Sequence, residues 1–325
     1  MKRLLTTLCC LFSLSLLWGQ NPAAYVIYDQ DGNSSDYQTL LEEMSQRDLV
    51  FLGEIHNCTI AHWMEKLIVA DLYKIHGEEL MLGAEMFERD DQVILNEYLQ
   101  GLIPESRFKA EAKLWENYAT DYRPLVEFAK EHHLPFIATN VARRYANLVS
   151  KEGLEALEKT SEEARQFIAP LPIHYIPNPL VDAYFQNMMN PCGTQTVANA
   201  DKTASKGRAQ VAKTGNGKTA TMPKMPSMAM MKANIDKLSL AQGVKDATMA
   251  WSISESLKGK MIHVNGSFHS TGHAGIINYL NVYRPGLKIG TVEVVLQKEV
   301  DVLEEQHKGK ADFIICVPDN MATTY

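Results

Sequence analysis

Short apolar runs alternate with longer stretches of helical periodicity along most of this chain. Six runs have the length of buried strands and end in turns, at residues 48–56, 78–87, 134–140, 260–270, 290–297 and 311–318. Between them, residues 58–76 place Ile60, Met64 and Ile68 on one helical stripe, and similar periodicity covers residues 91–100, 110–118, 122–132, 142–168 and 236–258. Because the runs are apolar throughout, they suit strands that are covered on both faces. The pattern therefore predicts an α/β fold, with a mostly parallel sheet flanked by helices.

Two segments depart from simple strand–helix alternation. The helical stretches within residues 88–192 are too long for single crossovers, so a small all-helical subdomain is expected there. Residues 194–234 are rich in Lys and Arg and contain no aromatic residue, and such a composition cannot bury enough apolar surface to order itself. We expect a mobile basic insertion at 194–234 within one α/β domain that covers residues 21–325.

The N-terminus has the layout of a Sec signal peptide. Lys2 and Arg3 precede an apolar run from Leu4 to Trp18 that is short for a membrane anchor. We expect residues 1–20 to be cleaved and the protein to be exported, with a periplasmic or outer-membrane-associated location. The residues just after the run include no cysteine, so a lipoprotein is not expected.

Charge and cysteine content narrow the class of protein. The formal net charge is -7, and cleavage of the leader would make it two units more negative, which disfavours nucleic-acid binding. Of five cysteines, Cys58, Cys192 and Cys316 lie beyond the leader, and an odd number excludes a fully paired disulfide framework.

Polar residues of the kind that bind ligands fall at the ends of four successive predicted strands. Glu54 and His56 close the first strand, Glu85 the second, Asn140 the third and His269 the fourth. Ligands bind at the carboxyl ends of strands in open parallel sheets, so this placement predicts a polar site along one sheet edge.

Two Gly-x-x-His motifs, Gly53 to His56 and Gly266 to His269, are the centre of this predicted site. Glycine lets a ligand or another backbone approach closely at a strand end. For a single histidine a structural role is the safer interpretation, but the group favours a site. One interpretation is a divalent metal held by His56, Glu85 and His269, with Glu54 and Glu85 as candidate acid–base residues for hydrolysis.

Other residues can extend the same site. His62 lies near the start of the helix that follows the first motif, and Arg89 and Arg143 add positive charge close to the strand ends. Asn140 and Arg143 at a helix start would suit a carboxylate or phosphate. Tyr122, Tyr175 and Tyr184 lie in the helical regions, where they could stack on or ligate a flat cofactor or simply pack.

Taken together, four segments resemble the ChaN-like haem-binding proteins, which share a superfamily with the Tiki metalloproteases, the TraB and GumN proteins and the erythromycin esterases. The segments read "VFLGEIHNCTIAHWMEKLI", "GAEMFERDDQ", "LPFIATNVARR" and "VKDATMAWSI…IHVNGSFHSTGHAGI". They carry both Gly-x-x-His motifs, Glu85, and Arg143 or Arg144.

The resemblance implies an α/β domain with a small helical domain and haem in a pocket, with a homodimer as one arrangement. It also implies tyrosine ligation of the iron, but no motif identifies which tyrosine. The expected function is an exported haem- or iron-binding protein for uptake or storage, with haem and outer-membrane uptake machinery as partners. The alternative is a metal-dependent esterase or peptidase that uses the same two motifs, so enzymatic activity stays an open question.

Overall fold

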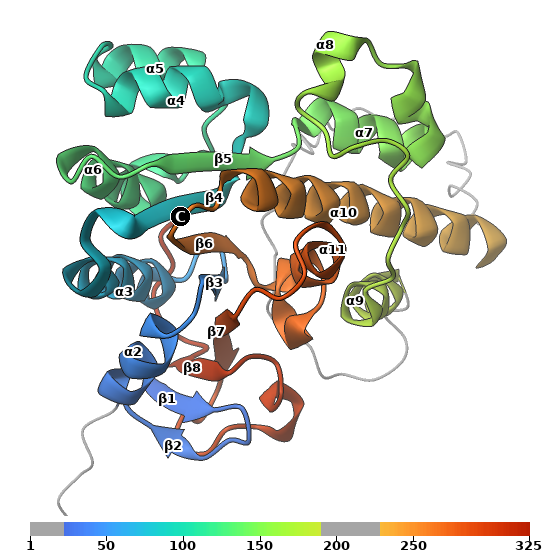
Figure 1. Cartoon of the computed structure of the whole chain (residues 1–325). Helices are drawn as coiled ribbons and strands as arrows, with labels where there is room; N and C mark the ends of the chain where they lie inside the picture. Colours follow the sequence, from blue (N-terminus) through green and yellow to red (C-terminus); the bar gives the residue numbers. More distant parts are fainter. Residues whose placement is uncertain (1–22, 190–227) are drawn as a thin grey trace, which may run out of the picture.

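A central eight-stranded sheet organises the protein in this computed structural model, which describes residues 23–189 and 228–325 (Figure 1). The sheet has the order β2-β1-β8-β7-β3-β6-β4-β5. Its strands are β1 (Val26–Asp29), β2 (Ser34–Ser35), β3 (Leu49–Glu54), β4 (Leu80–Glu88), β5 (Phe136–Asn140), β6 (Lys260–Gly266), β7 (Ile289–Gln297) and β8 (Phe313–Pro318).

The six apolar runs of the sequence form β3 to β8, and every pairing among these six strands is parallel. This confirms the predicted α/β class. The sequence pattern did not predict β1 and β2, which extend one edge in antiparallel fashion. Both are too short, at four and two residues, to produce a clear alternation.

Helices cover both faces of the sheet. They are α2 (Tyr37–Ser45), α3 (Thr59–His76), α4 (Gln92–Leu99), α5 (Glu105–Glu111), α6 (Arg123–Glu131), α7 (Arg143–Glu152), α8 (Glu162–Arg165), α9 (Pro179–Met189), α10 (Met228–Ser256) and α11 (Ile276–Tyr283). In Figure 1, α2, α3 and α6 lie on one side of the sheet, and α7, α10 and α11 on the other.

Alternation along the strands assigns each buried side chain to one of two cores. On β3, Val50 and Leu52 belong to the core shared with α3 and α6, whereas Leu49 and Phe51 belong to the core shared with α7, α10 and α11. Because side chains alternate at every residue, the polar ends of neighbouring strands can face different helical layers.

Two predicted helices differ in the structure. Instead of one helix at 110–118, α5 ends at Glu111, and the backbone N–H of Lys113 donates to Asp91 Oδ2 at 2.8 Å. The predicted helix at 142–168 is broken after α7 by Gly153, whose φ of 88° lies in the left-handed region.

The helical segments of residues 88–192 flank β5 rather than following one another without interruption. Figure 1 shows α4 and α5 above one end of the sheet, and α7 and α8 above the other helical layer. Helix α10 begins at Met228, so it includes the last residues of the predicted insertion. Residues 194–227 of that insertion, and the predicted signal peptide, lie outside the described residues. Among the residues described, no helix has the length and apolar content needed to span a membrane.

Candidate binding site at the strand ends

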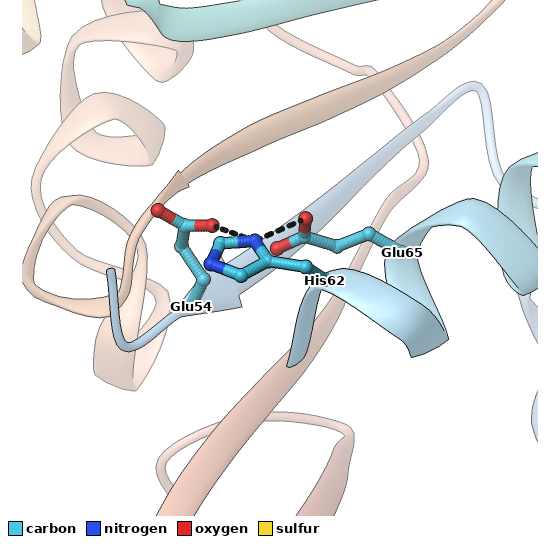
Figure 2. A group of neighbouring side chains, drawn as sticks. All are labelled: Glu54, His62 and Glu65. Carbon is cyan, nitrogen blue, oxygen red and sulfur yellow. Dashed lines mark hydrogen bonds and ion pairs between the residues drawn. The ribbon is translucent and has the colours of Figure 1, made fainter. Parts of the chain in front are cut away.

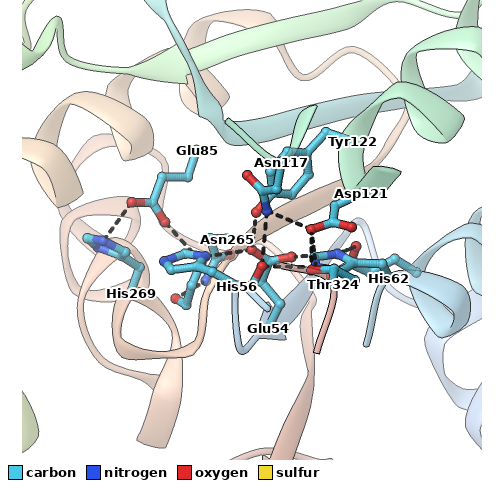
Figure 3. A network of polar contacts seen from close by, with 12 residues as sticks. Glu54, His56, His62, Glu85, Asn117, Asp121, Tyr122, Asn265, His269 and Thr324 are labelled. Atoms are coloured by element: carbon cyan, nitrogen blue, oxygen red, sulfur yellow. Dashed lines mark hydrogen bonds and ion pairs between the residues drawn. The ribbon is translucent and has the colours of Figure 1, made fainter. Parts of the chain in front are cut away.

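The carboxyl ends of β3, β4 and β6 bring two polar centres together at one edge of the sheet (Figure 3). Glu54 lies two residues after Leu52 on β3, so its side chain is on the same face of the sheet, which α3 and α6 cover. Glu85 alternates with Ala84, and so it lies on the opposite face, which α10 covers. The predicted single crevice is therefore two buried centres on opposite faces of the sheet, and His56 lies between them.

In the first centre, Glu54 is the residue that contacts most of the other side chains. Its Oε1 atom lies 2.6 Å from His56 Nδ1 and accepts a hydrogen bond from the Tyr122 hydroxyl at 2.8 Å. Its other oxygen, Oε2, lies 3.1 Å from His62 Nδ1. One buried carboxylate thus fixes the positions of two histidines and a tyrosine.

His62 links Glu54 to two further carboxylates. Its Nδ1 atom also lies 3.2 Å from Glu65 Oε2, one turn along α3. On the other side of the ring, Nε2 lies 3.3 Å from Asp121 Oδ2 and 3.2 Å from the His56 carbonyl oxygen. Both ring nitrogens therefore face acceptors, and only 6% of the side chain is exposed.

Asp121 connects this centre to two more distant segments. Asn117 donates to Asp121 Oδ2 at 2.7 Å and to the His56 carbonyl oxygen at 3.0 Å. The Thr324 hydroxyl also donates to Asp121 Oδ2, at 2.8 Å, and the Thr324 N–H donates to the carbonyl of Asn57. The segment after β8 therefore packs against the Gly-x-x-His turn of β3.

Burial and the charge of neighbouring side chains shift the pKa values of Glu54 and His62 in opposite directions. Burial would raise the pKa of Glu54, but His56 and His62 lower it to about 2. Burial would lower the pKa of His62, but Glu54 and Glu65 raise it to about 11. The pKa of Glu65 rises to about 8, because the carboxyl is buried and lies close to the charge of Glu54. At neutral pH, His62 is therefore a cation between the Glu54 carboxylate and a Glu65 carboxyl group that keeps its proton.

The second centre is a buried chain of Glu85, His269 and Asp246. His269 Nε2 lies 3.1 Å from Glu85 Oε1, and its Nδ1 lies 2.5 Å from Asp246 Oδ1 on α10. The backbone N–H of Gly266 donates to Glu85 Oε2 at 2.9 Å. These contacts link β4, α10 and the turn that follows β6.

In the second centre, too, burial and neighbouring charges shift the pKa values of His269 and Glu85 in opposite directions. Burial would lower the pKa of His269, but Glu85 and Asp246 raise it to about 10. The pKa of Glu85 falls well below its usual range despite burial, because His269 lies beside it. Burial raises the pKa of Asp246. An imidazolium between two carboxyl groups is the charge state that this geometry favours at neutral pH.

His56 stands apart from the other two site histidines because its side chain is 40% exposed, against 6% for His62 and 8% for His269. The ring packs edge-on against Trp115, with 4.8 Å between the ring centroids. A Cβ atom on Gly266 would come within 2.7 Å of His56 Cε1, so glycine is required there for His56 to occupy this place. The two Gly-x-x-His motifs meet at this contact.

Three of the other predicted residues lie around the edge in structural roles or on the surface. Asn140 donates to the Glu85 carbonyl oxygen at 3.0 Å and so holds β5 to β4. Arg89 donates to Ser252 and to the Gln166 carbonyl oxygen, which fastens it to α10 and the loop after α8. Arg143 is exposed at the first position of α7.

The three predicted tyrosines lie in different environments. Tyr122 is buried against Glu54, and burial raises its pKa far above the ordinary range. The Tyr175 hydroxyl lies 3.4 Å from Asp182 Oδ1, and its ring packs over Gly243 of α10. Tyr184 on α9 packs against Phe268, with 4.6 Å between the ring centroids. Only Tyr122 lies within the network of the first centre.

Within the described residues, the predicted metal ligands His56, Glu85 and His269 do not form a group whose ligand atoms all lie within 4.8 Å of one another, so this metal set stays a prediction. Glu85 and His269 are in contact, but the Nδ1 atom of His56 is bound to Glu54. Among the described residues, the group whose ligand atoms lie within 4.8 Å of one another is Glu54, His62 and Glu65.

Several residues of the site were not predicted from the sequence. Glu65 carries a usable signal, because His62 and Glu65 are three residues apart and so share one helical face. Asn117 and Asp121 are four residues apart, but they lie around a π-helical turn at Tyr118–Tyr122 that periodicity does not reveal. Thr324 has no sequence signal, because its contact with Asp121 spans 203 residues.

This fold and site define the class of the protein. The family model for haem-binding uptake proteins of the ChaN type, in the Tiki superfamily, matches residues 40–280. The chain belongs to this family. The matched range contains both Gly-x-x-His motifs and both buried centres, apart from Thr324.

A solved structure agrees with this assignment at the level of the fold. A structure of cofacial haem binding to ChaN of Campylobacter jejuni is similar with a TM-score of 0.61 and 15% identity, over 91% of this chain and 98% of that chain. A protein of Bacillus cereus has a TM-score of 0.45 and 12% identity, over 86% of this chain and 90% of that chain. No curated protein matches the chain.

Proposed function

We propose that this protein binds haem. The observation that carries the proposal is membership of the haem-binding ChaN family, with a match that contains the whole edge of β3, β4 and β6. The ChaN structure from Campylobacter jejuni binds haem cofacially, and this chain shares its fold along nearly its full length.

The described residues fit a flat, largely apolar group at one open face next to the second centre. Phe268, two residues after Gly266, is 39% exposed, and its ring packs against Tyr184 of α9. Exposed aromatic rings that are already packed together bury further apolar area when a planar ligand covers them. His56 and Tyr184 supply the donor types, imidazole and phenol, that bind haem iron in proteins.

We further propose that the protein is exported and takes part in haem uptake or storage. The sequence supports this through Lys2, Arg3 and the apolar run that follows them. Periplasmic or outer-membrane association, contact with uptake machinery and a homodimer belong to the same proposal. Secretion of a tagged chain into the periplasm, with cleavage near residue 20, is the result that supports it.

Replacement of Phe268 by alanine tests where haem binds. Fully burying a phenylalanine contributes roughly 1.5–3 kcal/mol, and 39% of Phe268 is exposed, so covering that part contributes about 0.6–1.2 kcal/mol. Phe268→Ala should therefore weaken haemin binding about three- to eightfold. Tryptophan quenching by haemin measures the affinity. Val302→Ala, at an exposed valine on the loop between β7 and β8, is the matched control and should bind like the wild type. Equal affinities for wild type and Phe268→Ala would exclude this face.

The alternative proposal is a metal-dependent hydrolase, and one observation favours it. The Glu54 carboxylate orients the ring of His56, and His56 is the accessible histidine of the site, which is the arrangement of an acid–base pair. Assays with ester and peptide substrates, with and without added divalent metal, test it. Turnover that His56→Ala abolishes would support the hydrolase, and an inert wild type would reject it.

A further inference from the structure

The Glu54, His62 and Glu65 side chains form a buried cluster separate from the open aromatic face (Figure 2). Glu54 comes from the end of β3, and His62 and Glu65 come from one face of α3. Figure 2 shows both carboxyl groups directed toward the His62 ring from opposite sides. The ligand-type atoms of the three residues lie within 4.8 Å of one another, and all three residues are buried.

Two carboxylate oxygens in this cluster are left without a hydrogen bond. Within the described residues, neither Glu65 Oε1 nor Glu54 Oε2 has a hydrogen-bond partner, although Glu54 Oε2 lies 3.1 Å from His62 Nδ1. The Glu65 side chain is only 4% exposed. An unpaired polar atom at such a depth costs about 1–3 kcal/mol, and more when it is charged, so a cation that contacted both carboxyl groups would be stabilised here.

The groups around the cluster already orient its ligand atoms. Glu54 Oε1 is bound to His56 and Tyr122, which leaves Oε2 to face His62. His62 Nε2 faces Asp121 and the His56 carbonyl oxygen, so its proton lies on that side. A histidine whose outer nitrogen donates to a carboxylate presents the other nitrogen, here Nδ1, to a metal.

We propose that Glu54, His62 and Glu65 bind one divalent transition-metal ion, with Asp121 as a positioning residue. The ion takes the place of the proton on Nδ1 and binds Glu54 Oε2 and a carboxylate oxygen of Glu65. Neighbouring ligand atoms around zinc lie about 3–3.5 Å apart, which follows from bond lengths near 2.1 Å. The distances from Nδ1 to the two carboxylates, 3.1 and 3.2 Å, already have this spacing.

The ligand set favours Zn²⁺, or Mn²⁺ as second choice, over Mg²⁺ and Ca²⁺. One imidazole nitrogen with two carboxylates is a mixed set that suits borderline cations, whereas magnesium and calcium prefer oxygen alone. This site is distinct from the predicted set of His56, Glu85 and His269, and it shares no ligand with the Phe268–Tyr184 face.

Metal binding by the full chain tests this site directly. After removal of metals with a chelator, wild type is incubated with Zn²⁺ or Mn²⁺ in the absence of haemin, and bound metal is counted by native mass spectrometry. We expect one equivalent, a higher melting temperature, and at least a hundredfold weaker affinity in Glu65→Gln. Asp121→Asn should weaken binding by about ten- to a hundredfold, as for other outer partners of metal-binding histidines.

Glu293→Gln is the matched control. Glu293 is also a buried glutamate with an oxygen that lacks a hydrogen bond within the described residues, but it lies on β7 away from His62. It should bind metal like the wild type. Wild type that takes up neither ion, or Glu65→Gln that binds as tightly as wild type, would overturn the site. A wild type without metal overturns the site even if a variant fails to fold, and metal uptake that Glu65→Gln weakens and Glu293→Gln does not assigns the ion to this site; neither result depends on haem.

Discussion

His269→Ala should lower the free energy of unfolding by roughly 3–5 kcal/mol, the usual cost of removing one partner from a buried ion pair. His269 is the cation between Glu85 and Asp246, at 3.1 and 2.5 Å, and all three side chains are buried. Alanine would leave two buried carboxyl groups facing each other without a cation between them. Urea unfolding at pH 7, followed by circular dichroism, measures the difference.

His273→Ala is the control for this experiment. His273 lies four residues further along the same turn, but it is half exposed, and its partner Asp312 lies 3.4 Å away near the surface. Exposed pairs contribute only about 0–1 kcal/mol, so this variant should unfold close to the wild type. If His269→Ala and His273→Ala lower the free energy of unfolding equally, the buried contacts of His269 with Glu85 and Asp246 do not hold the strand ends together.

Stability should also fall steeply as the pH rises from about 6.5 to about 10. Glu85 and Asp246 raise the pKa of His269 from 6.5 to about 10 on folding. A raised histidine pKa contributes stability that is fully present below pH 6.5 and is lost as the pH approaches the folded value. Each pKa unit corresponds to about 1.4 kcal/mol, so the loss should be of the order of a few kcal/mol.

Comparison of wild type with His269→Gln isolates this contribution. His62 also has a raised pKa, near 11, so some alkaline loss should remain in the variant. The difference in unfolding free energy between the two proteins should shrink between pH 6.5 and 10, because glutamine does not titrate. A constant difference across that range would mean that His269 is not protonated in the folded protein. His273→Gln should change the curve less than His269→Gln, because Asp312 raises the pKa of His273 at a half-exposed position where solvent screens the pair.

The sequence was sufficient to predict the central sheet, because β3 to β8 are buried on both faces and are therefore apolar along their length. It also placed polar residues near the correct strand ends, since that placement needs only the approximate end of each apolar run. Glu85, which was expected to close its strand, lies three residues before the end of β4, and His269 lies in the turn after β6. The order of strands brought His56 and Gly266 into contact, and the paired glycine motifs had suggested such an approach.

The division of the site into two centres could not be predicted, because it depends on strand bounds to the single residue. A shift of one residue would move Glu54 or Glu85 to the other face of the sheet. Thr324 and Asp121 meet only because the segment after β8 returns to the turn of β3. Such long-range contacts leave no local pattern in the sequence.

Titration of haemin into the full chain, followed by absorption spectroscopy, tests the central proposal most directly. Haem binding predicts a shifted and sharpened Soret band that saturates at a fixed stoichiometry, with a band position that Tyr184→Phe or His56→Ala changes if that residue ligates the iron. A wild-type spectrum that equals the sum of free haemin and free protein at every ratio would contradict haem binding by this protein.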